Sequence, residues 1–479
     1  MATTAASTGS PPSSRDRLAL EGSGFHPAVA AWFARRFPEG PTDAQARGWP
    51  VVRAGTDTLI AAPTGTGKTL AGFLVAIDEV YRAHAAAEAG VGEAGVGEAG
   101  AAQTRLVYVS PLKALAVDVE QNLARPLAEI AEVAGELGLS APEISVAVRT
   151  GDTAQSARAA MLRNPPTFIV TTPESLYLLV SAGRSRAILR RVRWVIVDEI
   201  HALVRDKRGA HLALTLERLD RLAEGARPQR IGLSATQRPI ERTARLLGGA
   251  GRQGGEEGRH ALPQIVDCGH RRELRVSLEL PTGELAAVQS DEQLADMVER
   301  IASHVAGHRT TLVFVNTRRL SERLAHLLGE RLGGERVAAH HGSLSVERRQ
   351  RTEARLRAGG LSALVATASL ELGIDVGPVD LVCQVGSPRS IATFLQRVGR
   401  ANHSRHGVPE GILLPSTRDE LVECAALLRA VRGGRLDSTP APIAPLDILA
   451  QQVVAEVGAA GVCEEDELYA MARGAAPYA

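Results

Sequence analysis

The sequence contains few aromatic residues and no long apolar run. Phe, Trp and Tyr make up 3% of its 479 residues, and they do not alternate with basic residues, so we do not expect a ladder of stacked bases. No stretch is long and apolar enough to span a bilayer, and the start of the chain does not resemble a signal peptide. These absences predict a cytoplasmic protein with no membrane partner.

Cysteine and lysine are also scarce. The four cysteines form no CxxC pair, which excludes the usual ligand spacing of zinc and iron–sulfur sites, and we expect reduced core thiols. They are Cys268, Cys383, Cys424 and Cys463. A lysine in so Arg-rich a chain is a candidate for a role that needs a compact ammonium group. The lysines are Lys68, Lys113 and Lys207. For Lys207 the alternative is that it is present by chance and has no special role.

Length and charge set two further limits. The chain exceeds what one core usually holds, so we expect two or three domains. The formal net charge is +1 at pH 7 and creates no overall field that would attract a polyanion. Any nucleic-acid site must therefore be a locally basic cleft.

Short apolar runs alternate with helical patterns along most of the chain, which is typical of parallel-sheet α/β domains. In the first half we expect strands at 58–61, 106–110, 167–171, 194–197 and 230–233. The alternation resumes near residue 294, with strands expected at 311–315, 364–366 and 381–384. The sequence therefore predicts two similar α/β domains in tandem.

Composition divides the chain into four segments. We expect a disordered tail at 1–21, an α/β domain at 22–265 with a flexible insertion at 85–103, a second α/β domain at 266–435, and a linker with a short helical piece at 436–479. The tail has too little apolar surface to order itself, and the insertion repeats Ala-Gly-Val-Gly-Glu. The last piece is too small to bury a core alone. It must dock on the two domains or begin a third.

A phosphate-binding loop follows the first expected strand and precedes a helical pattern. Its sequence is Ala62-Pro63-Thr64-Gly65-Thr66-Gly67-Lys68-Thr69, in which successive backbone amides can cradle phosphate oxygens. Lys68 can neutralise β/γ-phosphate charge, and the Thr69 hydroxyl can hold Mg²⁺. Ala62 replaces the first Gly of the common pattern, a small departure because the rest of the loop and its setting are intact.

Two carboxylates, Asp198 and Glu199, follow the strand expected at 194–197. One can hold the Mg²⁺ shell while the next polarises the attacking water, the division of roles that phosphoryl transfer needs. Alone, an acidic pair after a strand is more often a helix cap. The phosphate-binding loop upstream in the same domain favours the catalytic interpretation.

Several donors are gathered in the second domain, about 330 residues after the phosphate-binding loop. The segment is Gln396-Arg397-Val398-Gly399-Arg400-Ala401-Asn402-His403. Arginines so far away in sequence suit a finger that reaches the γ-phosphate across a cleft between domains. A solvated basic helix face is the alternative.

Together these motifs resemble those of superfamily 2 DExH-box helicases, in order and over almost all of both domains. The resemblance implies two tandem RecA-like domains that use ATP and Mg²⁺. The ATP site would comprise Gln45, Pro63, Thr64, Gly65, Thr66, Gly67, Lys68, Thr69, Gly373, Asp375, Arg397 and Arg400, with Thr69 and Asp198 holding the metal ion. Catalysis would rest on Lys68, Asp198, Glu199 and Arg400, and the coupling of hydrolysis to movement on His201, Ser234, Thr236 and Gln396. Nucleic-acid contacts would come from Pro111, Lys113, Arg149, Thr150, Gly151, Thr172, Asn316, Thr317, His341, Gly342 and Thr367.

Two assignments within this resemblance stay open. His403 stands where many relatives have a second Arg, so Arg400 alone is assigned as the arginine finger, with Arg397 and His403 as neighbours. The aromatic residue that stacks on adenine is one of three, each of which could instead pack in the core. The three are Phe25, Trp32 and Phe37.

Closer detail resembles one branch, the large helicase-related (Lhr) family, on the segments 369–375 and 387–390 that lead into 396–403. This implies 3′-to-5′ movement on single-stranded DNA, unwinding of DNA duplexes or RNA:DNA hybrids, a role in DNA repair and nucleoid association. The segment 445–452 resembles the entry to a winged-helix domain. The chain would then be an N-terminal fragment cut inside that domain, and any oligomerisation would depend on the absent C-terminal region.

The expected function is therefore an ATP-dependent helicase. One alternative is an RNA remodeller that clamps and releases without stepping, against which the Gln-Arg pair at 396–397 and the Ile-His pair at 200–201 argue. The other is a non-hydrolysing, ATP-gated nucleic-acid clamp. Intact Lys68, Glu199 and Arg400 argue against the clamp.

Overall fold

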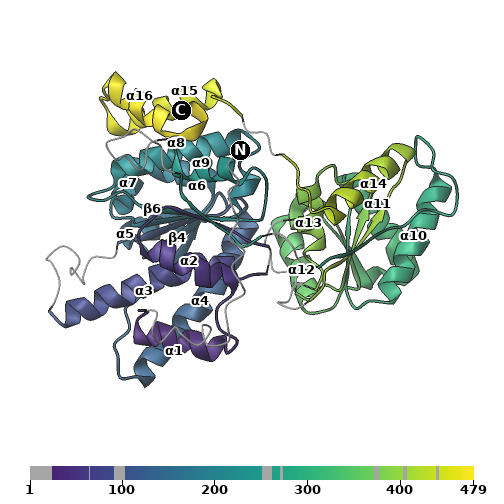
Figure 1. The fold of residues 1–479 in the computed structure, drawn as a ribbon, viewed down its shortest axis with the longest axis horizontal. Helices are drawn as coiled ribbons and strands as arrows, with labels where there is room; N and C mark the ends of the chain where they lie inside the picture. The colour runs from purple at the N-terminus through teal and green to yellow at the C-terminus, as the bar shows by residue number, and fades with distance from the viewer. Residues whose placement is uncertain are drawn as a thin grey trace, which may run out of the picture.

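The structure is a computed structural model that describes residues 24–63, 65–90, 103–250, 262–269, 273–371, 377–402, 407–438 and 442–479. It consists of two α/β lobes, called lobe one and lobe two in chain order, and a C-terminal helical segment (Figure 1). The expectations for the tail at 1–21, for most of the insertion at 85–103, and for Thr64, Gly373, Asp375 and His403 lie outside the described residues. Within the described ranges, no helix has the length and apolarity to cross a membrane.

Lobe one is built on a seven-stranded parallel sheet. Its spatial order is β3 (Val146–Arg149), β4 (Phe168–Thr171), β2 (Leu106–Val109), β5 (Trp194–Val197), β6 (Gln229–Ser234), β1 (Thr58–Ala61) and β7 (Gln264–Asp267). The central strands are buried on both faces, as the near-continuous apolar runs in the sequence require.

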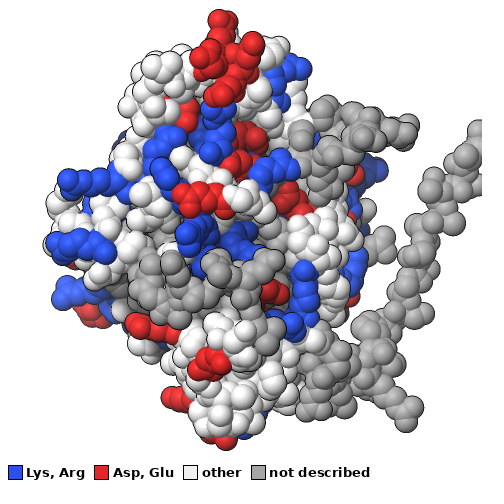
Figure 2. Space-filling model, turned by 90° about the vertical axis from the view of Figure 1, so that its left-hand side faces the viewer, with Lys and Arg blue, Asp and Glu red and all other residues white. Residues whose placement is uncertain are grey.

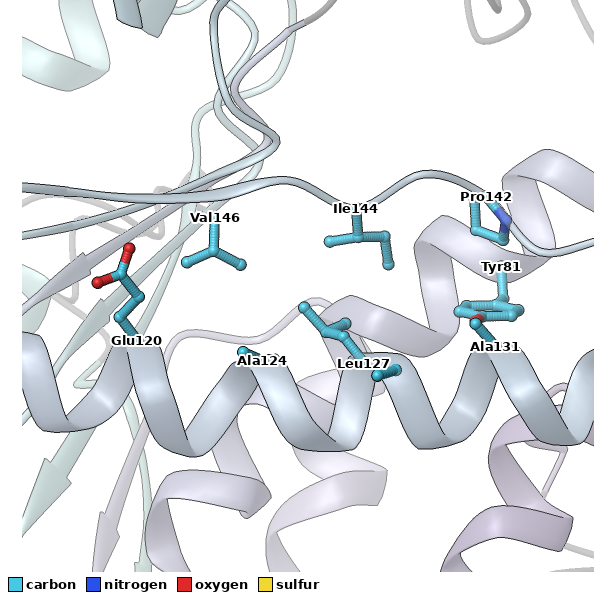
Figure 3. A pocket seen from close by; sticks show the side chains of 9 residues that line it. Tyr81, Glu120, Ala124, Leu127, Ala131, Pro142, Ile144 and Val146 are labelled. Atoms are coloured by element: carbon cyan, nitrogen blue, oxygen red, sulfur yellow. The ribbon is translucent and has the colours of Figure 1, made fainter. Parts of the chain in front are cut away.

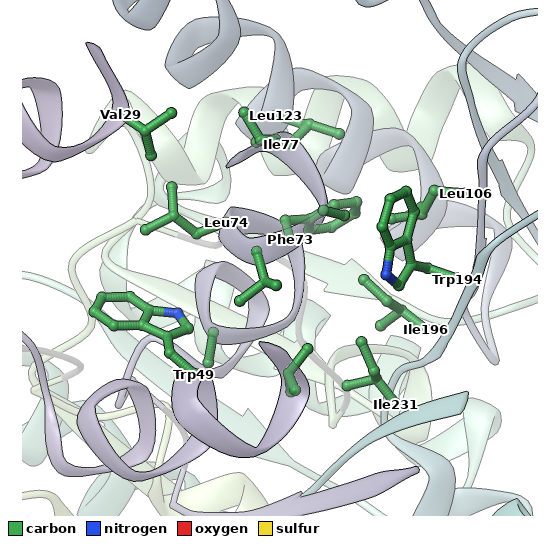
Figure 4. Packing of buried hydrophobic residues seen from close by; sticks show 14 of the residues in the cluster. Val29, Trp49, Phe73, Leu74, Ile77, Leu106, Leu123, Trp194, Ile196 and Ile231 are labelled. Atoms are coloured by element: carbon green, nitrogen blue, oxygen red, sulfur yellow. The ribbon is translucent and has the colours of Figure 1, made fainter. Parts of the chain in front are cut away.

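Alternate residues of these strands point to two separate cores. One core receives Ile60, Tyr108 and Ile196 and is covered by α1 (Pro27–Arg36), α2 (Asp43–Arg53), α3 (Lys68–Glu88) and α4 (Lys113–Glu136). Figure 4 shows Trp49, Phe73 and Trp194 packed among aliphatic side chains on this face. The other core is covered by α5 (Gln155–Arg163), α6 (Pro173–Ser181), α7 (Gly183–Leu189), α8 (Lys207–Leu222) and α9 (Ile240–Gly248). The three-layer α/β/α arrangement follows from this alternation.

Lobe two repeats the design with a six-stranded parallel sheet. Its order is β10 (Val337–His340), β11 (Ala363–Ala366), β9 (Thr311–Phe314), β12 (Leu381–Val385), β13 (Glu410–Leu414) and β8 (Arg275–Leu278). The helices α10 (Asp291–Ala306) and α11 (Arg318–Leu332) cover one face. The opposite face is covered by α12 (Val346–Arg357), α13 (Ile391–Val398) and α14 (Arg418–Arg432).

The C-terminal helices follow lobe two in sequence but pack on lobe one. The elements α15 (Leu446–Ala460), α16 (Glu465–Gly474) and η4 (Ala476–Tyr478) lie beside α8 (Figure 1). At the centre of this contact Arg218 donates hydrogen bonds to Glu456 at 2.7 Å and to Gln452 at 2.8 Å, and all three side chains are buried. Of the two alternatives for 436–479, the structure shows docking on an α/β lobe, and the winged-helix assignment stays a prediction.

The predicted fold class is confirmed, with two corrections to the boundaries. β7 pairs with β1 and ends at Asp267, so lobe one extends past the expected limit at 265. The expected flexible insertion begins inside a helix, because α3 continues to Glu88. Ala85, Ala86 and Ala87 have the highest helix propensity of any residue type and extend α3.

Candidate functional site

The phosphate-binding loop is preshaped by two glycines. Gly65 and Gly67 have φ values of 80° and 73°, in the left-handed region that side chains disfavour. Directly after them α3 begins at Lys68, whose ammonium donates hydrogen bonds to the carbonyl oxygens of Ala62 at 2.6 Å and Pro63 at 2.8 Å. The loop therefore combines a buried cation with the free amides of a helix N-terminus, the arrangement that binds phosphate groups.

Burial governs the charge of Lys68. Desolvation lowers the pKa of its ammonium, and the neighbouring Glu199 and Asp198 carboxylates oppose that shift. Arg400 of lobe two also lowers the pKa of Lys68, so its guanidinium lies within electrostatic range of the Lys68 ammonium. The expected arginine finger of lobe two thus influences the pKa of the expected phosphate-binding lysine of lobe one.

Asp198 lies directly after β5 and is surrounded by groups that suit a metal ion. Burial, followed by repulsion from Glu199, raises the pKa of Asp198 to about 7. The Tyr108 hydroxyl donates a hydrogen bond to Asp198 and is also close enough to Thr69 for a hydrogen bond. Two adjacent buried carboxylates beside a Thr hydroxyl fit a divalent cation held by Thr69 and Asp198. Mg²⁺ bound there would neutralise phosphate charge.

Glu199 adopts a backbone conformation that is rare for a residue with a side chain. Its φ is 44° and its ψ 37°, in the left-handed region. Its amide donates a hydrogen bond to Asp198 Oδ1 at 2.8 Å, which holds the two residues in this tight turn. Strained backbone of this kind is concentrated at functional sites, and here it places the expected water-polarising carboxylate at the carboxyl edge of the sheet.

His201 joins three of the predicted motifs. Its Nδ1 accepts a hydrogen bond from the amide of Ala235, between Ser234 and Thr236, at 3.1 Å. Burial lowers the pKa of His201 to about 3, so the ring is neutral near pH 7 and its proton resides on Nε2. Nε2 lies 2.5 Å from the side-chain nitrogen of Gln396 in lobe two. Because two N–H groups cannot bond to each other, the Gln396 amide bonds in its flipped orientation, with its oxygen as the acceptor. All four expected coupling residues therefore lie along one path between the lobes.

A small cavity of about 70 Å³ lies at this junction. Both lobes line it, and its walls are formed by Pro63, His201, Arg205, Ala235, Thr236, Gln237, Leu274, Ala392, Leu395, Gln396, Gly399 and Pro409. A larger pocket of about 590 Å³ lies elsewhere in lobe one, between α4 and the segment that leads into β3 (Figure 3). Tyr81, Leu127 and Ile144 make that pocket largely apolar, and none of the predicted site residues lines it.

Arg400 and Arg397 have different surroundings. Arg400 is buried and donates a hydrogen bond to the carbonyl of Glu371 at 3.0 Å. Arg397 uses every guanidinium nitrogen inside lobe two, donating to the Glu371 carboxylate and to Gln384, and lies over the Phe314 ring at 5.1 Å. The structure therefore favours Arg400 as the finger and gives Arg397 a supporting place, while the ATP contact expected of Arg397 stays a prediction.

Gln45 is tied to the phosphate-binding loop. Its amide nitrogen donates to the carbonyl of Gly67 at 3.3 Å, and its oxygen accepts from the amide of Thr42 at 2.9 Å. Among the three candidate adenine-stacking residues, Phe25 and Trp32 are buried in the lobe-one core and Phe37 is partly buried against it. Phe25 and Trp32 therefore pack in the core, which was the alternative to stacking on adenine.

The residues expected to contact nucleic acid in lobe one lie after β2, β3 and β4. These three strands are adjacent at one side of the sheet, whereas the nucleotide motifs follow β5, β6 and β1 at the other. Pro111 follows β2, Lys113 pairs with Asp152, Arg149 donates to the carbonyl of Thr150, Gly151 lies against Lys113, and Thr172 caps α6. The sheet order therefore separates a nucleotide side from an expected nucleic-acid side.

The same division applies to lobe two, where the expected contacts follow β9, β10 and β11. Asn316 donates to the carbonyl of Ser387, Thr317 caps α11, His341 is hydrogen-bonded to Glu322, Gly342 is exposed, and Thr367 follows β11. Several of these side chains already have partners within the protein. Their backbone groups are then the ones available for phosphate contacts.

Two positioning arginines were not predicted from the sequence. Arg208 donates to Glu174 at 2.7 Å and to the carbonyl of Pro111 at 2.8 Å, joining the loops after β4 and β2. Arg158 donates to the carbonyls of Gly151 and Thr153, both at 2.8 Å. These contacts span up to 97 residues, and no local pattern in the sequence marks them. Tyr108, which contacts Asp198, was missed for the same reason.

Comparison with known proteins agrees with this geometry. The chain matches the DEAD/DEAH box helicase family over residues 42–243 and the helicase conserved C-terminal domain over residues 292–405. It is 42% identical over 95% of its length to the Lhr helicase/probable uracil glycosylase of Mycolicibacterium smegmatis, of which it covers 31%. The chain belongs to the Lhr family of helicases. It is also 38% identical to the ATP-dependent helicase Lhr-Core of Methanocaldococcus jannaschii, covering 94% of this chain and 50% of the relative.

A solved structure of an Lhr helicase matches the whole arrangement. The Mycobacterium smegmatis helicase Lhr bound to single-stranded DNA and AMP-PNP shares 44% identity with a TM-score of 0.82, over 95% of this chain and 55% of that one. The Lhr match confirms the two RecA-like lobes. The chain spans about a third to a half of the length of these curated relatives.

Proposed function

We propose that this chain is a motor that hydrolyses ATP to move along single-stranded DNA in the 3′-to-5′ direction. In this proposal it unwinds DNA or RNA:DNA duplexes during DNA repair at the nucleoid. The observation that carries the motor part is the junction between lobes, where His201 meets Gln396 and Arg400 lies within electrostatic range of Lys68. Closure of this junction on ATP would complete the site, and its opening would follow hydrolysis.

Each protein group has a defined role in that cycle. The loop amides and Lys68 bind the phosphates, Glu199 orients and polarises the attacking water, and Arg400 stabilises the charge that develops on the transferred phosphoryl group. Neutral His201 connects the Asp198–Glu199 turn to Ala235 in lobe one and to Gln396 in lobe two. The state of the nucleotide is thereby linked to the relative position of the lobes.

The expected DNA side of the molecule supports sequence-tolerant binding. The loops after β2, β3 and β4 in lobe one and after β9, β10 and β11 in lobe two offer hydroxyls, backbone amides and few aromatic groups. Figure 2 shows basic and acidic side chains interspersed on one outer face, without an unbroken basic field. Contacts to phosphates in the loops, rather than stacking or base readout, are the mode that this composition favours.

Steady-state ATP hydrolysis tests the proposal. The rate should rise strongly with single-stranded DNA, and Glu199→Gln should abolish the stimulated rate while the protein stays folded. Glu241→Gln, an exposed change on α9, is the matched control. Strand displacement with a 3′ tail should exceed displacement with a 5′ tail by about tenfold or more, a gap of roughly 1.4 kcal/mol. Equal rates with both tails, or hydrolysis indifferent to DNA, would overturn the proposal.

A further inference from the structure

The helix α13 carries Gln396, which acts at the junction, and leads into Arg400, the expected arginine finger. Gln396 and Arg397 lie on it, and Arg400 follows two residues after its end. The N-terminal end of α13 also reaches the junction, because Ala392 lines the cavity between the lobes. Whatever fixes the first turn of α13 therefore fixes the groups that face the nucleotide.

The first turn of α13 is capped from a distant segment. The Ser390 hydroxyl accepts a hydrogen bond from the amide of Thr393 at 3.3 Å and donates one to the Asp437 carboxylate at 2.8 Å. The same Asp437 oxygen accepts from the amide of Ala392 at 3.0 Å. A carboxylate at a helix N-terminus satisfies free amides and is favoured by the helix dipole. Asp437, which is partly buried, thus completes a cap that Ser390 alone begins.

The residue after Asp437 contacts the other lobe. Ser438 forms a parallel backbone bridge with Arg238, two residues after Thr236 in lobe one. From Ala444 onward the chain lies on lobe one, where Ala444 donates to the carbonyl of Pro477 at 2.9 Å and α15 packs on α8. The segment between lobe two and α15 therefore contacts α13 with one residue and lobe one with the next.

We propose that Asp437 is a positioning residue that links the docked helices α15 and α16 to α13. The bridge of Ser438 to Arg238 holds Asp437 beside lobe one, on which α15 docks, and Asp437 holds the first turn of α13. Undocking of α15 then displaces Gln396 and Arg400 and slows hydrolysis. This inference rests on the proposed ATP-hydrolysing function, and it adds a route by which the C-terminal helices regulate the site.

Kinetic variants test the cap. Asp437→Ala should lower the DNA-stimulated kcat about three- to tenfold and leave the KM for ATP within twofold, because the phosphate-binding loop is in lobe one. Asp437→Asn keeps an acceptor oxygen and should recover part of the rate. Asp419→Ala removes an exposed carboxylate from the first turn of α14 in the same lobe and should change nothing. A merely structural role would lower the melting temperature of Asp437→Ala without changing the kcat of the folded protein.

A double-variant cycle tests the link to docking. Glu456→Ala removes the carboxylate that pairs with Arg218 and Arg186 and loosens the docked helices, whereas Lys207→Ala with Arg221→Ala removes only exposed ion pairs and is the control. Glu456→Ala should lower kcat in the native background and have no further effect in the Asp437→Ala background. Reductions that multiply in the combined variant would overturn the link.

Hydrogen exchange gives a readout that does not depend on activity. Amides of residues 391–398 should exchange at least threefold faster in Asp437→Ala and in Glu456→Ala, and not in Asp419→Ala or in Lys207→Ala with Arg221→Ala. If the native chain hydrolyses no ATP but exchange follows this pattern, the proposed function fails and the link stands. Unchanged exchange in α13 after both changes would refute the link, whatever the rate of hydrolysis.

Discussion

The imidazole of His201 in lobe one and the side-chain amide of Gln396 in lobe two form a hydrogen bond between the lobes. His201 is held by Ala235 on its other nitrogen, so the ring cannot turn to another partner without breaking that contact. The motif Asp198–His201 is therefore connected to lobe two through one neutral side chain, that of His201.

Removal of the Gln396 amide should uncouple the lobes. Gln396→Ala leaves the buried His201 N–H without its partner, which costs about 1 to 3 kcal/mol where the contact is needed. The DNA-stimulated kcat should fall about tenfold or more with little change in the DNA-free rate. Gln350→Ala, an exposed glutamine of α12, is the control in the ATPase assay. A variant that loses both rates equally would contradict the coupling role.

Arg400 should matter for hydrolysis far more than for ATP binding. An arginine finger contributes about 10³- to 10⁵-fold to phosphoryl transfer, so Arg400→Ala should reduce kcat by at least about 10³-fold. Affinity for a fluorescent ATP analogue should change by a few-fold, since the loop amides and Lys68 stay in place. Arg429→Ala on the exposed side of α14 supplies the matched loss of charge. Comparable losses of affinity and rate would argue for a binding role instead.

The pKa of Asp198 predicts an unusual dependence of stability on pH. Because the folded pKa, about 7, lies above the ordinary value of 3.8, the native state keeps a proton that the unfolded chain releases between these values. Stability without metal or nucleotide should therefore fall as pH rises from about 4 to 7. Asp198→Asn removes this penalty and should stabilise the protein on the order of 2 kcal/mol at pH 8.

Urea unfolding in EDTA at pH 4.5 and pH 8 measures this effect. The gain from Asp198→Asn should be large at pH 8 and mostly lost at pH 4.5. Asp291→Asn, which changes an exposed carboxylate on α10, should show no such difference. If Asp198→Asn destabilises the protein at both pH values, the carboxylate is ionised and stabilising in the folded state, and the assigned direction is wrong.

The buried contact between α8 and α15 predicts different outcomes for single and double changes. Glu456→Ala leaves the buried Arg218 guanidinium without its carboxylate and should cost about 3 to 5 kcal/mol. Arg218→Met with Glu456→Leu removes the buried cation together with its carboxylate and should cost less than Glu456→Ala, although Arg186 and Gln452 each lose a partner. Lys207→Ala, from an exposed pair, should cost less than about 1 kcal/mol. Proteolysis of the segment before α15 monitors docking, and equal cleavage of all three variants would disprove this account.

The sequence predicted elements whose pattern is local. The strands expected at 58–61 and 194–197 match β1 and β5, because buried central strands of a parallel sheet are continuous apolar runs. Five strands were not predicted. β3, β7, β8 and β10 lie at sheet edges and are at least partly exposed, which gives a weaker signal, whereas β13 is a buried inner strand whose apolar run was missed. The phosphate-binding loop could also be predicted from the sequence, because the residues that form it are consecutive.

The groups that the sequence did not predict act over long separations. Tyr108 meets Asp198 across 90 residues, and Asp437 caps a helix that begins 46 residues earlier. Neither residue belongs to a spaced pattern, and each has an ordinary local setting, Tyr108 in a strand and Asp437 in irregular chain. Their functions depend on the packing of α/β elements, which one sequence does not specify by periodicity.

The pairing of Arg218 with Glu456 also constrains how the protein is made. The two residues are 238 positions apart, and all of lobe two lies between them. When lobe one has left the ribosome, Arg218 on α8 still lacks its carboxylate, and the face of α8 that α15 and α16 will cover is exposed. Lobe one can collapse early, but its final assembly must wait until lobe two has been translated and α15 has emerged.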